Sequence, residues 1–394
     1  MKMKVVAIKS IADVSSGNTP SRCKSEYWNG SIPWITTGEL ESGYVTASKE
    51  CVTEKALKET ALKLYHKGTV LIAMYGQGKT RGTAAVLGID ATVNQACAAL
   101  TMHSGCPKFL FYQLQNSYHA IRKLSNTGNQ ENLNAEIIKN FKIPWPDELE
   151  QQKIAAILST QDKVIELKEK FLAQKKQQKK YLMQQLLTGK LRLPDVNGEW
   201  TSVKLKELLI ERNEKNVEQN HRICSVAVSK GVVDQIEHLG RSYAAADTSN
   251  YGVAHYGDII YTKSPTGDFS LGIIKQNRMR ENVAVSPLYG IYKPISFSTG
   301  YLLNVHFESA INTKNYLTPI VQKGAKNTIA ISNSAFLENK ILFPMDEATR
   351  SKIEKIFELT DHEIDLLQKS IEAEKQKKKA LMQLLLTGKA SVQI

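Results

Sequence analysis

A long segment occurs twice in this chain of 394 residues, and the repeat constrains the fold more than any other feature. Residues 153–190 and 352–389 align without a gap at an offset of 199, and about half of the aligned positions are identical. An internal repeat of this kind defines the architecture before any local pattern does. It divides the chain into a variable block, a long segment, a second variable block and a second long segment.

Apolar residues recur in both copies at spacings of three, four and seven, which puts them on one face of an α-helix. In the first copy they are Ile154, Ile157, Leu158, Val164, Ile165, Phe171, Leu172, Leu182, Met183, Leu186 and Leu187; in the second they are Ile353, Ile356, Phe357, Ile364, Leu367, Ile371, Leu381, Met382 and Leu385. Prolines precede each copy, and each ends in Thr-Gly-Lys, which is typical of a helix C-terminus. We therefore predict helices over 148–190 and 346–390, each about 60 Å long.

An apolar stripe of this length needs a partner of equal length, and the other copy matches it in length and in its ends. We predict an antiparallel intramolecular coiled coil with a pseudo-two-fold axis, which would place the two blocks at opposite ends of a rod. The alternatives are that each helix packs on its own block or on another copy of the chain. Lysine clusters at 175–180 and 375–379 are explained either as solvated helix surface or as contacts for phosphate or an acidic protein.

The chain carries a formal net charge of +13, which favours a polyanionic partner, nucleic acid first of all. Most of this charge lies in the blocks and tails, because the two helical segments are together only modestly basic. The five cysteines show no metal-binding spacing, so we expect reduced thiols and no metal site. No apolar run of transmembrane length and no signal peptide is present, so we expect a cytoplasmic protein with no membrane association.

The two blocks, 1–147 and 191–345, share a frame of short strands and turns. His66-Lys67-Gly68 precedes the apolar strand 69–74, and His255-Tyr256-Gly257 precedes its counterpart 258–262. Each block also opens with a similar amphipathic segment, at 6–11 and at 203–208. Between these landmarks the blocks differ, as expected if each recognises a different target. The predicted fold class is α+β, with two α/β domains separated by two long helices.

The polar loops that follow the two matching strands are the first candidates for contact with nucleic acid. The candidates there are Tyr75, Gln77, Lys79, Thr80 and Arg81 in the first block, and Lys263, Ser264 and Thr266 in the second. Gln, Arg and Lys side chains bond base edges, whereas Ser, Thr and backbone amides suit phosphate. Further candidates are Arg22, Lys24, Gln130, Arg241, Ser242, Tyr243, Arg278 and Arg280. The alternative is that these residues belong to ordinary exposed turns.

Catalytic motifs are missing from the sequence. Gly78-Lys79-Thr80 lacks the earlier glycine of a phosphate-binding loop, because that position is Ala73, and the glycines of this loop do not fit the dinucleotide-binding spacing. Asp147 with Glu166 and Lys168 imitates a nuclease motif, but the last two lie inside a predicted helix. The Asn-Pro-Pro-aromatic tetrapeptide of adenine methyltransferases is also missing. We predict that the chain catalyses no reaction.

The chain resembles the specificity (S) subunit of type I restriction–modification systems along nearly its full length. The resemblance rests on the repeat, on residues 16–21 (SGNTPS) with Tyr27-Trp28 and Ile32-Pro33-Trp34, on residues 132–134 (NLN) with 143–146 (IPWP), and on the Leu-Leu-Thr-Gly-Lys ends. It implies that each block is a target-recognition domain for one half of a bipartite site in double-stranded DNA. The helices would then be a spacer and a platform for two methyltransferase (M) subunits.

The resemblance also implies where the chemistry lies. S-adenosylmethionine would be bound by the M subunits, with no cofactor in this chain, and restriction (R) subunits are a further partner of such complexes. Residues 223–233 of the second block depart from the family pattern, so we expect dissimilar half-sites. The alternative from another class is a non-enzymatic coiled-coil scaffold with non-specific nucleic-acid binding.

Overall fold

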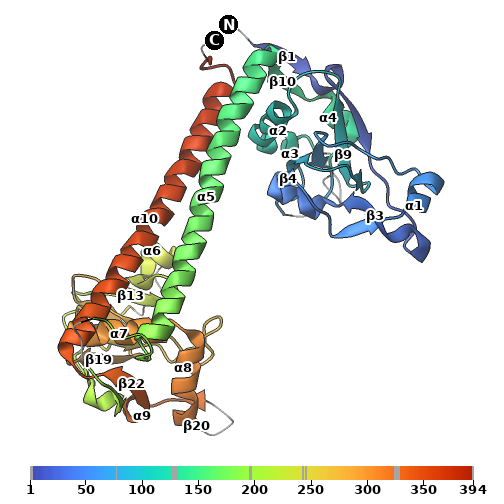
Figure 1. The fold of residues 1–394 in the computed structure, drawn as a ribbon. Helices are drawn as coiled ribbons and strands as arrows, with labels where there is room; N and C mark the ends of the chain where they lie inside the picture. The colour runs from blue at the N-terminus through green and yellow to red at the C-terminus, as the bar shows by residue number, and fades with distance from the viewer. Residues whose placement is uncertain are drawn as a thin grey trace. The chain divides into compact units, whose positions relative to one another are not determined.

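The computed structural model describes residues 3–76, 78–125, 132–194, 198–241, 244, 246–323 and 329–392. It divides into two compact units (Figure 1). Unit 1 consists of Met1–Lys170 with Gln368–Ile394, and unit 2 of Phe171–Leu367. Each unit therefore contains one of the two variable blocks together with a stretch of both long helices.

The long helices α5 (Glu148–Leu186) and α10 (Glu347–Leu385) have 39 residues each. In unit 1, Asp162 of α5 binds Lys378 at 2.6 Å and Lys168 binds Glu374 at 2.7 Å. In unit 2, Lys175 and Lys179 bind Glu363 and Asp361, both at 2.7 Å. Residue numbers fall along α10 as they rise along α5, so the two helices are antiparallel. The predicted antiparallel intramolecular pairing is confirmed.

The lysine clusters of the helices contribute to this pairing. Four of these lysines, Lys175, Lys179, Lys375 and Lys378, bind carboxylates of the opposite helix. Lys179 and Lys378 keep only 13% and 19% of their side-chain area exposed. These four lysines are thus neither simply solvated nor free for a partner. The apolar stripe is also narrower than predicted, because Ile157 and Phe171 are 37% and 46% exposed.

Unit 1 is built around a five-stranded sheet of order β2-β9-β6-β7-β4. Its strands are β2 (Ala12–Ser16), β4 (Tyr44–Val45), β6 (Val70–Ala73), β7 (Ala84–Leu87) and β9 (Cys97–Met102). A smaller sheet contains β3 (Trp28–Ile35), β5 (Glu50–Val52) and β8 (Thr92–Val93), and a third pairs β1 (Lys4–Ala7) with β10 (Lys142–Trp145). The α-helices of this block are α1 (Glu54–Glu59), α2 (Pro107–Asn116), α3 (Tyr118–Lys123) and α4 (Ala135–Asn140).

Unit 2 contains a four-stranded sheet of order β12-β19-β16-β17. Its strands are β12 (Leu209–Glu211), β16 (Ile259–Tyr261), β17 (Ile274–Gln276) and β19 (Gly290–Pro294). A second sheet contains β13 (Arg222–Ala227), β14 (Gly231–Asp234), β15 (Gly252–Ala254) and β18 (Val283–Val285). Two further pairs join β11 (Trp200–Lys204) to β22 (Lys340–Pro344) and β20 (Gln322–Lys323) to β21 (Ile329–Ala330). The α-helices are α6 (Gln235–Leu239), α7 (Phe297–Phe307), α8 (Ala310–Leu317) and α9 (Asn333–Glu338).

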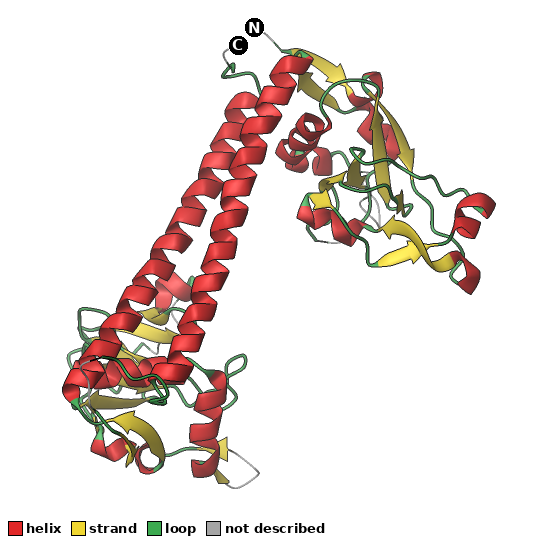
Figure 2. Cartoon of the chain, in the orientation of Figure 1, coloured by secondary structure: helices red, strands yellow, loops and turns green. Residues whose placement is uncertain are grey.

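The two blocks share one topology. The order β2-β9-β6-β7 of unit 1 corresponds strand for strand to β12-β19-β16-β17 of unit 2. In both blocks three α-helices follow, with the β20–β21 pair before the last of them in unit 2, and then a strand that pairs with the first strand of the block and leads into a long helix (Figure 2). The predicted shared frame is therefore confirmed. The secondary sheets differ, with three strands in unit 1 and four in unit 2, and residues 223–233, which depart from the family pattern, lie in the β13–β14 hairpin.

Each block packs on both long helices. The core of unit 1 combines strand residues such as Ile72 and Leu100 with Ile154 of α5 and Leu385 of α10. The core of unit 2 likewise includes Leu186 of α5 and Phe357 of α10. Burial of such side chains contributes roughly 1.5–3 kcal/mol each, so each block is fixed to a helix pair and not to one helix. Among the described residues, no helix combines the length and the hydrophobicity needed to cross a membrane.

Candidate nucleic-acid interface

In unit 1 the candidate loop joins β6 to β7. Gly76, Gly78 and Gly82 have φ angles of +139°, +60° and +84°, a region that residues with a side chain rarely adopt. They let the chain reverse direction between β6 and β7. Tyr75 is 40% exposed. Lys79 is exposed and Thr80 half-buried, whereas the candidate Gln77 lies outside the described residues.

Arg81 differs from the other candidates of this loop because it is buried, with 7% exposure. Its backbone carbonyl accepts a 2.7 Å hydrogen bond from Nη1 of Arg122 in α3. A side chain this buried has little area to offer to a base edge. Tyr75 and Lys79 are therefore the more accessible candidates on this loop.

In unit 2 the corresponding loop joins β16 to β17 and forms a tight hairpin. Thr266 and Phe269 exchange two backbone hydrogen bonds of 3.0 Å. Ser264 and Thr266 are exposed, and Thr266 Oγ1 donates to the Ser264 carbonyl at 3.5 Å. Lys263 is half-buried with φ of +61°. Burial lowers the pKa of Lys263, and the nearby Glu211 carboxylate opposes this shift. An anion placed here would further favour the charged form of this lysine.

Arg22 and Lys24 lie outside the loops, beside the small sheet of unit 1. The Arg22 guanidinium stacks 3.7 Å from the Trp28 ring centroid and donates to both Glu50 carboxylate oxygens. Hydrogen bonding from Arg22 lowers the pKa of Glu50. Lys24 Nζ donates to the Tyr27 hydroxyl at 3.0 Å. Both cations remain exposed, but each already has a partner that DNA would have to displace.

The remaining candidates lie in unit 2. Arg278 stacks 4.9 Å from the Tyr301 ring and approaches Glu358 of α10 at 3.9 Å, so part of its role is to hold the block on the helix. Arg241 and Arg280 are exposed. Gln130, Ser242 and Tyr243 lie outside the described residues. The structure thus brings six described candidates onto two corresponding loops as accessible or half-buried side chains: Tyr75, Lys79, Thr80, Lys263, Ser264 and Thr266.

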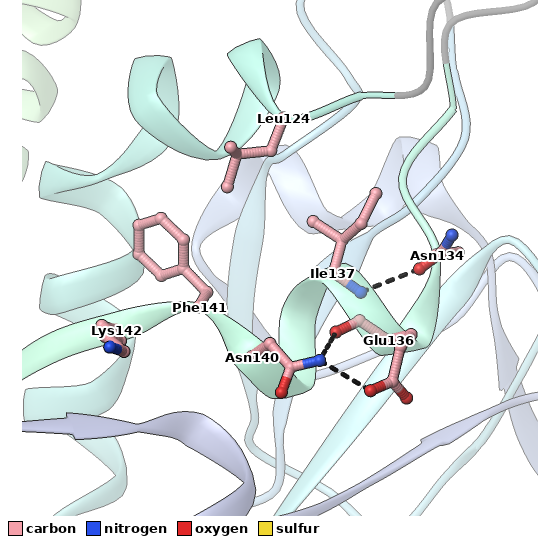
Figure 3. A pocket seen from close by; sticks show the side chains of 7 residues that line it. All are labelled: Leu124, Asn134, Glu136, Ile137, Asn140, Phe141 and Lys142. Atoms are coloured by element: carbon pink, nitrogen blue, oxygen red, sulfur yellow. Dashed lines mark hydrogen bonds between the residues drawn. The ribbon is translucent and has the colours of Figure 1, made fainter.

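A separate hollow in unit 1 is lined by seven residues of α4 and its surroundings (Figure 3). They are Leu124, Asn134, Glu136, Ile137, Asn140, Phe141 and Lys142. Two of its polar groups are already satisfied, since Asn134 caps α4 through Ile137 N at 2.8 Å and Asn140 donates to the Glu136 side chain at 2.6 Å. None of the predicted site residues lines this hollow. In the part of the chain that the structure describes, no cluster of three potential metal ligands occurs.

Comparison with known proteins relates the first part of the chain to one family. Residues 1–177 match the family model of the type I restriction modification DNA specificity domain. The MjaIX specificity subunit of Methanocaldococcus jannaschii is 34% identical over 172 residues, which are 42% of this chain and 39% of that protein. The EcoR124I/EcoR124II specificity subunit of Escherichia coli is 30% identical over 151 residues, 37% of each chain. These alignments span about two fifths of the relatives' length.

A solved structure extends the likeness to the whole fold. The crystal structure of the S subunit of a type I restriction–modification system from M. genitalium superposes with a TM-score of 0.61 over 98% of this chain and 96% of that one, at 15% identity. The matching domain, the two blocks of one topology and the antiparallel helix pair agree with each other. Residues 1–177 therefore carry a type I restriction modification DNA specificity domain, and the chain as a whole has the fold of that S subunit.

Proposed function

We propose that this chain reads a bipartite, asymmetric site in double-stranded DNA, with one half-site bound by each block. The observation that carries the proposal is the pair of blocks that share one strand order but carry different loops after the corresponding strands β6 and β16. A common frame supports a common mode of docking, and different loop side chains support different base contacts. The net charge of +13 supplies the phosphate attraction that DNA affinity requires.

The helix pair would dock two methyltransferase (M) subunits and serve as the spacer between the half-sites. Restriction (R) subunits would join the same complex, which would act in the cytoplasm. The M subunits would bind S-adenosylmethionine, so the chain itself needs no cofactor. Blocks fixed to both helices support this role, because neither block can then slide along the pair.

The experiment adds purified chain, with and without M subunits from the same organism, to DNA with S-adenosylmethionine and maps methylated adenines by sequencing. We expect no methylation by the chain alone and methylation at one bipartite motif by the complex. Methyl transfer by the chain free of M subunit would refute the non-catalytic role. Sequence-independent binding without a methylated motif would favour a scaffold instead.

A further inference from the structure

We infer that Tyr118 and Arg122 of α3 are positioning residues that set the shape of the β6–β7 loop, and with it the base preference of one half-site. Tyr118 Oη donates to the Lys79 carbonyl at 2.7 Å, and Arg122 Nη1 donates to the Arg81 carbonyl at 2.7 Å. The two donors are also joined, because Arg122 Nη1 donates to Tyr118 Oη at 3.2 Å. This inference rests on the proposed function of the loop.

These contacts fall where the loop backbone is least restrained by the sheet. The last strand-like bonds of the hairpin are Ala73 N to Thr83 O at 2.9 Å and Gly82 N to Ala73 O at 2.8 Å. Beyond them, Thr83 N and Thr83 Oγ1 donate to the carbonyls of Thr80 and Lys79 at 3.0 and 3.1 Å, while glycines at 76 and 78 favour no single backbone conformation. The two bonds from α3 add to those of Thr83 on the return side of the loop, so α3 helps to select the conformation.

The packing around the contacts leaves little room for adjustment. A Cβ atom on Gly82 would lie 3.1 Å from Cγ of Arg122 and 3.5 Å from the Tyr118 ring. The Arg122 guanidinium also lies 5.2 Å from the centroid of the Tyr118 ring, within cation–π range. Loop and helix therefore fit closely, and a change in α3 moves Lys79 without touching a residue of the loop.

The test uses the complex of the full chain with its M subunits and the variants Tyr118→Phe and Arg122→Ala. For each variant, methylation rates are measured on DNAs that carry every single-base change in either half-site. We expect discrimination in the half-site of the first block to fall roughly 2- to 10-fold per hydrogen bond lost. The other half-site should keep its discrimination, because its loop belongs to unit 2.

Tyr44→Phe is the matched control in the same block, since the Tyr44 hydroxyl forms no hydrogen bond with a described residue and its ring is 45% exposed. It should leave both half-sites unchanged. Unchanged specificity in Tyr118→Phe and in a folded Arg122→Ala protein would overturn the inference, and so would equal loss in both half-sites. If the wild-type complex methylates no preferred motif, the proposed function is refuted instead. Failure of the inference and failure of the proposed function are therefore distinguishable.

Discussion

Lys378 binds Asp162 at 2.6 Å, and their repeat counterparts Lys179 and Asp361 are bound at 2.7 Å. Each aspartate also accepts a hydrogen bond from a tyrosine of the adjacent block: Tyr112 donates to Asp162 at 2.7 Å and Tyr301 to Asp361 at 2.9 Å. The same Tyr–Asp–Lys triad thus occurs once in each unit. It ties a block to α5 and α10 together, and it fixes which residues of the two helices are opposite each other.

The first prediction compares the lysines of the two triads. Lys179 is the more buried and binds two carboxylates, since Glu308 lies 2.6 Å away in addition to Asp361. Lys179→Met leaves two acids together without a cation, and we expect it to lower the free energy of unfolding by about 2–3 kcal/mol. Lys378→Met leaves the partly exposed Asp162 without its cation but still bonded to Tyr112, and should cost about 1 kcal/mol. Denaturant unfolding of both variants measures the difference; equal costs would contradict this ranking.

The second prediction concerns the glycines that end the long helices. Gly189 and Gly388 have φ of +70° and +72°, so alanine at either position should cost about 1–2 kcal/mol of unfolding free energy. At Gly189 a Cβ atom would also lie 2.8 Å from the ring of Trp200, whereas at Gly388 it would meet the flexible Met3 side chain at 3.2 Å. We therefore expect Gly189→Ala to lower the unfolding free energy by about 1 kcal/mol more than Gly388→Ala does. Thermal unfolding of the pair is the measurement, and a milder Gly189→Ala would refute the argument.

The third prediction is a pH dependence of stability. Burial lowers the pKa of His306 in α7 to about 4. The unfolded chain, with an ordinary histidine pKa near 6.5, binds the proton more readily, so stability present above pH 6.5 is lost as the pH falls toward 4. The loss is about 3 kcal/mol at pH 4. Urea unfolding of wild type and His306→Gln is measured at pH 7, 5.5 and 4.5. The unfolding free energies of the two proteins should converge as the pH falls, and a constant difference between them would exclude His306 as the cause.

The fourth prediction separates two neighbouring candidates of the β6–β7 loop. Arg81→Ala should lower the stability of unit 1 because the side chain is buried. If Arg81 also pairs with a base, the same substitution should reduce discrimination between bases at one half-site by about 1–3 kcal/mol. Lys79→Ala should leave stability unchanged and weaken DNA binding. The affinity of this variant for DNA should also depend less on salt concentration than that of wild type. Melting curves and binding at several salt concentrations distinguish the two. A Lys79→Ala complex that binds as wild type does would move the contact elsewhere in the block.

The sequence predicted the helix pair well because the repeat carries its chemistry: Asp162, Lys179, Asp361 and Lys378 all lie at identical repeat positions. The matching strands were equally visible, since His66 and His255 each precede a turn with a glycine at positive φ, Gly68 and Gly257. What the sequence did not predict depends on contacts between distant positions. The burial of Arg81 and the hydrogen bonds from α3 to the β6–β7 loop depend on residues about forty positions apart in the sequence. No local sequence pattern indicates such contacts.

The last prediction tests the spacer role through the triads. Asp162 and Lys179 are separated by 17 positions on α5, and Asp361 and Lys378 by 17 on α10. Both triads can therefore form together only if the two helices keep equal lengths between these residues. Deleting residues 169–175 and 368–374 together removes one heptad from each helix and keeps that equality. The double deletion should shorten the DNA spacer between the two half-sites by about 3 base pairs. This value follows from a rise of 1.5 Å per helix residue and 3.4 Å per base pair.

The half-sites should stay as they were, because the deletion leaves both blocks and both triads intact. Deleting residues 169–175 alone is the control, since it puts one triad out of register and should lower the unfolding temperature and the methylation rate together. Sequencing of methylated adenines in cells that carry each variant with the M subunits reads the spacer directly. An unchanged spacer in a folded double deletion would mean that the distance between half-sites is set by the partner subunits and not by the helix pair.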